Sequence, residues 1–221
     1  MWSNVTPNTL LYIPMKTDLL DHSNYNRSIT NNWVSVSWWI WVFNWSSNLN
    51  AWTDERTKFQ KLANWTISVW FKITAWQWSW QNAYVIWKAR MHPNTQSNII
   101  YWIWYQSDWK LVAWVFPWNS RSPAPVPYWS TIQLSLNTWY NIVLTKSWTT
   151  KKVYINWSIV ATQTLQDTTS TDNPPLTIWS ATYYNSNSYI TWNISRVIME
   201  EITWNDTDIS KDYMKMKNNY N

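Results

Sequence analysis

Hydrophobic and polar residues alternate along most of the chain in short stretches, a period of two that is typical of β-strands with one buried face. These stretches are rich in Ile, Val, Thr and Tyr, and Asn, Ser, Pro or Trp separates them. Repeated pairs of stretches with a two-residue connection predict an antiparallel sandwich or barrel rather than βαβ units. The predicted strands are 10–14, 40–44, 66–74, 83–90, 98–106, 110–116, 131–135, 139–146, 151–156, 159–165, 176–180 and 192–202.

Three connections between these strands carry tryptophan where a tight turn normally requires glycine. Asn156-Trp157 and Asp108-Trp109 each lie between two predicted strands, and Trp148 lies in a third connection. A type I′ turn needs positive φ at both central residues, which strains a bulky side chain. With glycine at the three tryptophan positions, the segments become ordinary Asn-Gly, Asp-Gly and Ser-Gly turns. We therefore expect hairpins at all three places.

The composition points the same way. The 221 residues include 25 Trp and no Gly, and most of the tryptophans fall in segments that we interpret as turns. At an average usage of about 7% Gly, the chance of finding none is on the order of 10⁻⁷. We hypothesise that the gene uses UGA for glycine and that UGA was translated as tryptophan. Trp70, Trp139 and Trp204 lie in alternating or helix-entry contexts and are expected to be genuine; the alternative is a truly Trp-rich protein.

One helix is predicted, near the C-terminus. Asn205 or Asp206 can cap it, acidic residues fall in its first turn, and lysines lie near its end. Apolar residues at helical spacing form a stripe that we expect to pack on a sheet edge. The members of this stripe are Ile209, Tyr213 and Met216.

Several classes of protein are excluded by what the chain lacks. Without cysteine there is no disulfide, thiolate metal site or cysteine nucleophile. No run of about 18 apolar residues is present, so we expect no membrane span. The N-terminal segment lacks the positive region and apolar core of a signal peptide, so none is expected in this chain. The net charge of +5 is spread out, so we expect no nucleic-acid partner.

Six segments, taken in order, resemble motifs of one family when glycine replaces the suspect tryptophans. The segments and the motifs are 41–47 (GVFNGSS), 66–72 (TISAWVK), 139–145 (WYHVVLT), 152–156 (VYVNG), 176–180 (LTIGS) and 192–197 (GNISRV). Together they resemble the concanavalin A-like lectin/glucanase superfamily in its laminin-G-like form. The resemblance extends from about residue 10 to residue 220, which is nearly the whole chain.

The resemblance implies an all-β fold, a two-sheet antiparallel jelly-roll sandwich with one short C-terminal helix. Residues 1–221 would form a single domain, with 1–9 as a flanking lead-in. Domains of this kind are often one module of a larger surface, envelope or virion-type protein, so we expect a longer chain and an extracellular, cell-surface or virion location. The fold does not imply one function.

The glucanases of this family need two carboxylates on one face of a strand, about 5–5.5 Å apart for a retaining enzyme. Glu200 and Glu201 are the only acidic neighbours in a strand-like segment, and adjacent strand residues point to opposite faces. The acids of the helix, Asp206, Asp208 and Asp212, are expected to cap it. We therefore predict no catalytic residues and no enzyme activity.

The remaining titratable residues do not form a convincing metal site. His22 and His92 lack partners at the spacing of a catalytic triad and are interpreted as surface or loop residues. Asp18 and Asp21 are the best candidates for calcium ligands, but calcium prefers several oxygen ligands, so surface solvation is the preferred interpretation. We expect no metal site and no cofactor, with calcium left open.

Sugar binding needs exposed aromatic rings together with hydrogen-bonding side chains. Tyr84, Lys88 and Arg90 share one face of the predicted strand 83–90 and could line a groove. In the hairpin 100–116, a turn at 108–109 would pair Tyr105 with Val112. The opposite face would then hold Gln106 beside positions 102 and 104, where glycine would allow a ligand to approach closely.

The last candidates are the loop tyrosines Tyr183, Tyr184 and Tyr189. We predict a non-catalytic, lectin-like carbohydrate-binding module whose partner is a glycan or a surface protein. The alternative is a structural or protein–protein adhesion module of the same fold without a sugar site.

Overall fold

The structure is a computed structural model, and it describes residues 5–14, 18–32, 34–37, 40–43, 48–51, 62–76, 83–89, 99–105, 110–115, 128–164, 176–180 and 190–220. Strands and one C-terminal helix make up most of these residues. The strands are β1 Thr9–Ile13, β2 Ile29–Asn32, β3 Ser35–Ser37, β4 Ile40–Phe43, β5 Asn48–Ala51, β6 Asn64–Trp76, β7 Ala83–Ala89, β8 Ile99–Tyr105, β9 Lys110–Val115, β10 Tyr128–Gln133, β11 Trp139–Ser147, β12 Thr150–Ile155, β13 Ser158–Thr164, β14 Leu176–Ser180 and β15 Ile190–Glu200. The helix is α1 Asp206–Tyr220.

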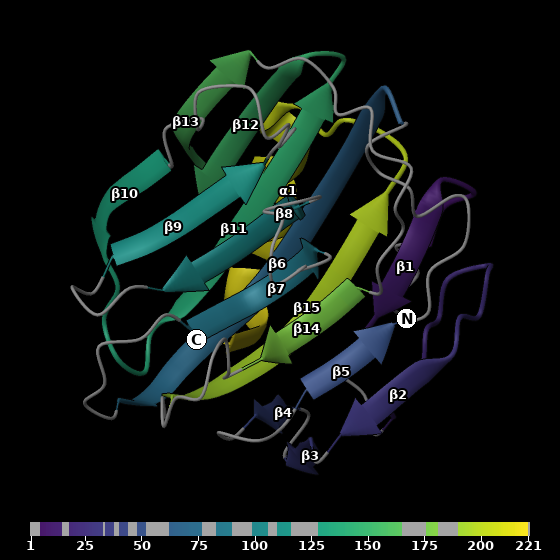
Figure 1. Cartoon of the computed structure of the whole chain (residues 1–221), viewed down its shortest axis with the longest axis vertical. Helices are drawn as coiled ribbons and strands as arrows, with labels where there is room; N and C mark the ends of the chain where they lie inside the picture. Colours follow the sequence, from purple (N-terminus) through teal and green to yellow (C-terminus); the bar gives the residue numbers. More distant parts are fainter. Residues whose placement is uncertain are drawn as a thin grey trace, which may run out of the picture.

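The strands form two antiparallel sheets that pack face to face (Figure 1). Sheet A has the order β13-β12-β11-β6-β15-β4-β3, with β1 also paired to β15. Sheet B has the order β10-β9-β8-β7-β14-β5-β2. Strands that are far apart in the sequence therefore lie side by side, as β6 does with β15. The predicted two-sheet antiparallel sandwich with one C-terminal helix is confirmed.

The main core lies between the sheets. Ile67, Val69 and Phe71 on β6 belong to the same buried cluster as Val85 on β7 and Ile178 on β14. Since successive strand residues point to opposite faces, every second residue of β6 enters this core. Burial of an aliphatic or phenylalanine side chain contributes about 1.5–3 kcal/mol, which makes the shared interior the main stabilising term.

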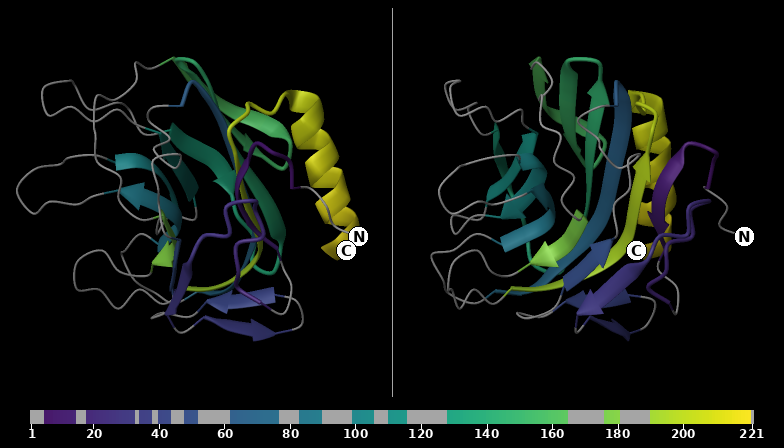
Figure 2. Two further views of the ribbon diagram at one scale, coloured as in Figure 1. Left: turned by 90° about the vertical axis from the view of Figure 1, so that its right-hand side faces the viewer. Right: turned by 45° about the vertical axis from the view of Figure 1, so that its right-hand side comes forward.

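The helix α1 packs against the outer face of sheet A and covers part of it (Figure 2). Ile209 packs with Val143 and with outer-face residues of β12 and β15. Tyr213 and Met216 pack against Trp70 on β6. The predicted apolar stripe of the helix is confirmed, but the expectation that it packs on a sheet edge was wrong. The helix crosses the face because Trp70 on β6 and Val143 on β11 offer apolar side chains there, between polar neighbours such as Ser68 and Asn141.

Most of the predicted strands are present, with ends that differ by a few residues. The strands β2, β3 and β5 were not predicted from the sequence, because they contain Asn and Ser and have little intrinsic strand propensity. β2 pairs with β5, and β3 pairs with β4, so these short segments gain their hydrogen bonds from neighbours rather than from their own composition.

The register of the β8–β9 hairpin differs from the prediction by one residue. Tyr105 pairs with Leu111, not with Val112, and Ile103 pairs with Ala113. This register belongs to a connection with an odd number of residues, whereas the prediction assumed a two-residue turn. A slip of one residue changes which residues of β9 lie opposite those of β8, so the predicted pairing of Tyr105 with Val112 was wrong.

Two of the three predicted turns are described, and both are confirmed as hairpins. Asn156-Trp157 joins β12 to β13, and both residues have positive φ, 47° and 67°. Trp148 and Thr149 join β11 to β12, and Trp148 has a φ of 53°. The third turn, at 108–109, lies outside the described residues.

Most of the described tryptophans, however, lie within strands, so our interpretation that most of them lie at turns was wrong for this part of the chain. Trp41, Trp65 and Trp192 are fully buried in the core. An indole in the middle of a strand can point into the core. When the residues on either side of a tryptophan are polar, the sequence pattern does not distinguish a buried strand position from a turn.

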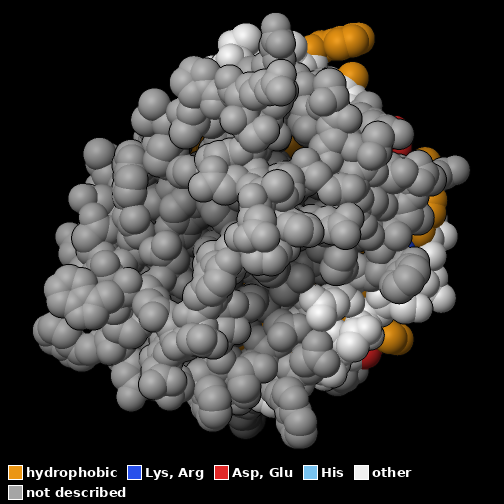
Figure 3. Space-filling view, in the orientation of Figure 1, with side chains coloured by type: hydrophobic (Ala, Val, Ile, Leu, Met, Phe, Trp, Pro, Cys, Tyr) orange, Lys and Arg blue, Asp and Glu red, His pale blue; other side chains and the backbone are white. Residues whose placement is uncertain are grey.

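The described part of the surface is varied. In the orientation of Figure 1, the described residues reach the right-hand rim, where hydrophobic and a few acidic side chains are visible (Figure 3). Among the described residues, no helix is both long enough and apolar enough to cross a membrane.

Candidate functional site

The glycan-binding residues predicted from the sequence belong to sheet B and its connections. Tyr84 and Lys88 lie on β7, opposite Trp104 and Tyr101 of β8. Since β7 pairs with β8 and with β14, it is a central strand and not a sheet edge. The other predicted residues lie outside the described part of the chain: Arg90, Gln106, Tyr183, Tyr184 and Tyr189. A glycan site on sheet B therefore stays a prediction.

A polar pocket of about 620 Å³ lies beside the N-terminal end of α1, on the outer face of sheet A. Its walls come from the β11–β12 hairpin and from the connection between β15 and α1. The lining residues are Thr145, Ser147, Thr150, Lys152, Tyr154, Thr203, Trp204, Asn205, Asp206 and Thr207.

The β11–β12 hairpin supplies one wall because its residues alternate between the core and the outer face. Thr145 pairs with Lys152, one residue from Leu144 and Val153, which face the core. Outer-face side chains near the turn are therefore polar. Since α1 begins only at Asp206, the helix leaves this end of the outer face uncovered.

The connection between β15 and α1 supplies the other wall and is held to sheet A by hydrogen bonds. The Thr66 hydroxyl donates to the carbonyl oxygen of Ile202 at 2.8 Å and accepts from the amide of Trp204 at 2.9 Å. The Thr203 hydroxyl donates to the carbonyl oxygen of Lys146. The connection is therefore tied to both β6 and β11, which sets the position of the residues that follow it.

Asn205 caps α1, as one of the two sequence alternatives expected. Its side-chain oxygen accepts from the amide of Asp208 at 3.0 Å, and the Asp208 carboxylate accepts from the amide of Asn205 at 3.2 Å. Asp206 instead accepts a hydrogen bond from the Tyr154 hydroxyl at 2.8 Å. The expectation of a capping role was therefore correct for Asp208 and wrong for Asp206.

The pocket combines several kinds of hydrogen-bonding group. Lys152 and Asp206 supply one positive and one negative charge, and Ser147, Thr150 and Thr207 supply hydroxyl groups that donate and accept. Within the described part of the chain, Lys152 forms no ion pair. Such a lining can bind a ligand that carries several hydroxyl groups of its own.

The Tyr154 hydroxyl at the pocket is held in its neutral form. Burial and then the hydrogen bond to Asp206 raise the pKa of Tyr154 above its ordinary value of 10.0. Burial also raises the pKa of Tyr12 and of Tyr213. A folded-state pKa above the unfolded value stabilises the fold below pH 10, and this contribution is lost as the pH rises above 10.

We therefore expect the free energy of unfolding to fall steeply above pH 10, and to fall less steeply in Tyr154→Phe. Loss of the hydrogen bond should cost this variant about 1 kcal/mol at pH 7. Tyr213→Phe is a matched control, since the Tyr213 hydroxyl has no hydrogen bond to the described residues. This variant should also lose stability less steeply above pH 10, but its free energy of unfolding at pH 7 should not fall by the value of a hydrogen bond. Urea denaturation between pH 7 and 12 measures the free energy of unfolding of each variant. The same dependence on pH above 10 in Tyr154→Phe and wild type would contradict the prediction.

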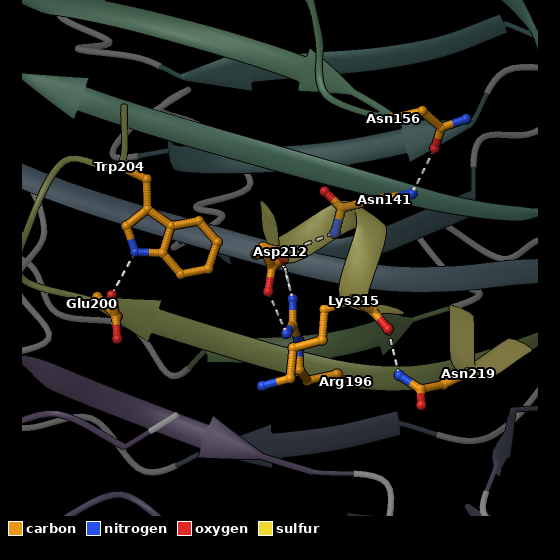
Figure 4. A network of polar contacts seen from close by, with 9 residues as sticks. Asn141, Asn156, Arg196, Glu200, Trp204, Asp212, Lys215 and Asn219 are labelled. Atoms are coloured by element: carbon orange, nitrogen blue, oxygen red, sulfur yellow. Dashed lines mark hydrogen bonds and ion pairs between the residues drawn. The ribbon is translucent and has the colours of Figure 1, made fainter. Parts of the chain in front are cut away.

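A buried carboxylate lies next to the pocket (Figure 4). Glu200 accepts hydrogen bonds from Trp204 Nε1 and, at 3.0 Å, from the Thr9 hydroxyl. Glu201 is exposed and follows the end of β15. Glu200 therefore anchors the indole of Trp204, and the two acids do not share a face.

A second buried polar network joins α1 to sheet A (Figure 4). Arg196 on β15 donates through both terminal nitrogens to the Asp212 carboxylate on α1, with 2.6 Å between Nη1 and Oδ1. Ser68 accepts from Arg196 at 3.1 Å and from Asn141 at 3.2 Å. This network was not predicted from the sequence, and the expected capping role of Asp212 was wrong. An acidic residue next to Tyr213 in an apolar stripe was the available signal, because a buried carboxylate requires a partner.

The two aspartates considered for calcium are engaged in other contacts. Asp21 is buried and accepts from the amides of Tyr12, Ser23 and Arg27 at 2.9–3.0 Å. The interpretation of Asp21 as a solvated surface residue was therefore wrong, because its carboxylate organises the loop after β1. Asp18 contacts His22 Nε2 at 2.7 Å. In the described ranges, no group of three or more His, Cys, Asp or Glu could hold a metal ion.

The sequence profile of one family matches residues 46–209, and that family is described as the concanavalin A-like lectin/glucanases superfamily. A comparison with curated protein sequences finds no match.

Solved structures are similar to the fold. The binding domain of botulinum neurotoxin serotype C1 superimposes with a TM-score of 0.75 at 15% identity, over 96% of this chain and 53% of that one. A second structure comes from botulinum neurotoxin type C, whose cell entry is described as dependent on interaction with two ganglioside molecules. It superimposes with a TM-score of 0.74 at 16% identity, over 95% of this chain and 51% of that one. The binding domain of botulinum neurotoxin DC in complex with rat synaptotagmin II superimposes with a TM-score of 0.73 at 16% identity, over 95% of this chain and 52% of that one.

At these identities the likeness concerns the fold alone, and the chain spans about half the length of the toxin domains. The fold and the family expected from the sequence motifs are both confirmed.

Proposed function

The chain belongs to the concanavalin A-like lectin/glucanase superfamily, and on that premise we propose that it is a non-catalytic carbohydrate-binding module of a larger surface, envelope or virion-type protein. Structural neighbours of about twice its length are binding domains, which supports a module within a longer, extracellular chain. The fold is shared with a toxin whose cell entry depends on gangliosides, lipids that carry a glycan.

The pocket beside α1 is the observation that carries the proposal. A saccharide offers many hydroxyl groups and apolar C–H faces, so its binding site needs donors, acceptors and aromatic surface together. Lys152 and Asp206 offer a charged donor and a charged acceptor, and the largely buried rings of Trp204 and Tyr154 contribute to the same lining. The hydrogen bonds that fix Asp206 and Trp204 support binding with little loss of conformational entropy.

A glycan array on the purified chain, with and without calcium, tests the proposal. We expect binding to at least one class of glycan. Lys152→Met and Asp206→Asn should each weaken that binding about tenfold, because a hydrogen bond with a charged group contributes about 1.5–3 kcal/mol. Lys211→Met, which removes an exposed lysine of α1 outside the pocket, is the control with the same change of charge and should bind like wild type.

Binding that is unchanged in both pocket variants would place the glycan site elsewhere. The predicted residues of sheet B would then be tested through Tyr84→Ala and Lys88→Met.

A protein-adhesion module is the second candidate function. The complex of a structural neighbour with rat synaptotagmin II supports it, since the same fold there binds a protein. An array without binding to any glycan, in the presence or absence of calcium, would favour this candidate.

A further inference from the structure

The turn between β12 and β13 has a backbone shape that glycine normally provides. Ile155 pairs with Ser158, so Asn156 and Trp157 are the two central residues of the hairpin. Their φ values of 47° and 67° are both positive, as in a type I′ turn. Asparagine tolerates this conformation, and glycine is the usual residue at the second position, but a bulky residue there is an outlier.

The turn between β11 and β12 has the same property at a different position. Ser147 pairs with Thr150, and between them Trp148 has a φ of 53° while Thr149 is not in the positive region. Positive φ at the first central residue alone is the pattern of a type II′ turn, in which glycine occupies that position. The amide of Trp148 donates to the carbonyl oxygen of Ala63 at 2.7 Å, so this shape is tied to the residue that precedes β6.

Neither indole buries much of its apolar surface. Trp148 is 71% exposed and Trp157 is 46% exposed, although the Trp157 ring lies 4.4 Å from the ring of Tyr213. Left-handed backbone at a residue with a Cβ atom lowers the folding equilibrium constant about fivefold to thirtyfold. Both positions therefore combine an unfavourable backbone with a large apolar side chain in water.

We propose that residues 148 and 157 are glycine in the protein made by its native organism, and that both are encoded by UGA, which specifies glycine in that gene. The absence of glycine from all 221 residues has the same cause. The two turns are an independent observation, since they concern backbone shape and not composition. The positions of buried Trp41 and Trp192 have no such backbone signature and are not part of the proposal.

Trp70 and Trp204 provide the contrast. Trp70 is buried and lies against the rings of Trp139 and Tyr213, and Trp204 donates to Glu200. Each uses the indole for a contact that glycine could not make. Their codons should be UGG.

Glycine in place of Trp148 would also change the surroundings of the pocket beside α1. Ser147 and Thr150 line it, and Trp148 lies between them in the chain. Glycine at 148 would remove an exposed indole next to the pocket lining, so ligand binding is best measured on the corrected chain.

Mass spectrometry of the protein isolated from its native organism tests the proposal directly. Trypsin cleavage after Lys146 and Lys151 releases residues 147–151, and this peptide should have the mass of Ser-Gly-Thr-Thr-Lys. The peptide that contains residue 157 should likewise have glycine there, and the codons for 148 and 157 should be UGA. Tryptophan at residue 148 or at residue 157, or UGG at either codon, would overturn the proposal.

Paired variants of the printed chain test the structural argument. Glycine and alanine both remove the ring, but only glycine removes the Cβ atom from a residue with positive φ. The folding equilibrium constant of Trp148→Gly should exceed that of Trp148→Ala about fivefold, and Trp157→Gly should exceed Trp157→Ala by a similar factor. At Trp70, within a strand, alanine should be the better of the two. Alanine equal to or better than glycine at both turns would count against the proposal.

Discussion

Replacing Arg196 with alanine should lower the free energy of unfolding by about 3–5 kcal/mol, because the variant leaves a buried carboxylate without its cation. Asp212 is buried on the side of α1 that faces sheet A and accepts hydrogen bonds from both terminal nitrogens of Arg196, and Ser68 and Asn141 complete the polar group (Figure 4). A typical domain has only about 5–15 kcal/mol of stability. Urea denaturation followed by circular dichroism measures the loss.

A double variant separates the ion pair from the packing of α1. In Arg196→Met with Asp212→Leu, both charges are replaced by apolar side chains of similar size, which often costs little or even stabilises the fold. We therefore expect the double variant to be more stable than Arg196→Ala by at least about 2 kcal/mol. A single variant that loses less than about 1 kcal/mol would show that the carboxylate is readily solvated or neutralised, contrary to this account.

Replacing Trp70 with alanine should also cost about 3–5 kcal/mol, since it removes the largest side chain between β6 and α1. Trp70 is fully buried, stacks on Trp139 with 6.4 Å between ring centroids, and lies 5.5 Å from the ring of Tyr213. Together with Met216 these rings form the second contact between helix and sheet. The loss is expected in the same urea experiment.

Trp148→Ala is the matched control, because it removes an identical side chain from an exposed turn. Its effect should stay within about 0.5 kcal/mol of wild type. Trp70→Phe, which keeps an aromatic ring in the cavity, should recover part of the loss. If Trp70→Ala and Trp148→Ala had equal effects, Trp70 would not be the anchor of α1 that its contacts imply.

The elements predicted best are those whose local pattern agrees with their final environment. β6, β11 and β12 alternate in sequence because one face enters the core between the sheets, and the prediction matched their positions. The cap was predicted at Asn205 or Asp206, and Asn205 provides it, because a cap depends on residues within one turn of the helix. Family motifs added the fold, since several short segments in one order are more specific than any single strand.

The elements that were missed obtain their structure from distant partners. β2 and β5 are short and polar, and they exist as strands because they pair with each other and, for β5, with β14. The β8–β9 register was wrong by one residue because the type of its turn was assumed from two residues alone. Asp212 was assigned to capping because its partner Arg196 lies on another element, 16 residues away in the chain.

The candidate binding residues also differ in whether the sequence could point to them. The sequence pointed to sheet B through Tyr84 and Lys88, which share a strand, and those residues remain predictions. The pocket beside α1 could not be anticipated, because Lys152 and Asp206 are 54 residues apart in the chain and meet only when α1 packs on the outer face of sheet A.

The sequence by itself therefore determined the strands with strong alternation, the C-terminal helix with its apolar stripe, and the two hairpin turns that contain Trp148 and Trp157. Each of these depends on residues that are close together in the chain. The tertiary structure alone decided which face of sheet A is covered by α1, how Arg196 and Asp212 are paired, and where the pocket lies. These features arise from contacts between distant segments, whose geometry is set by the packing of the whole domain rather than by any local period.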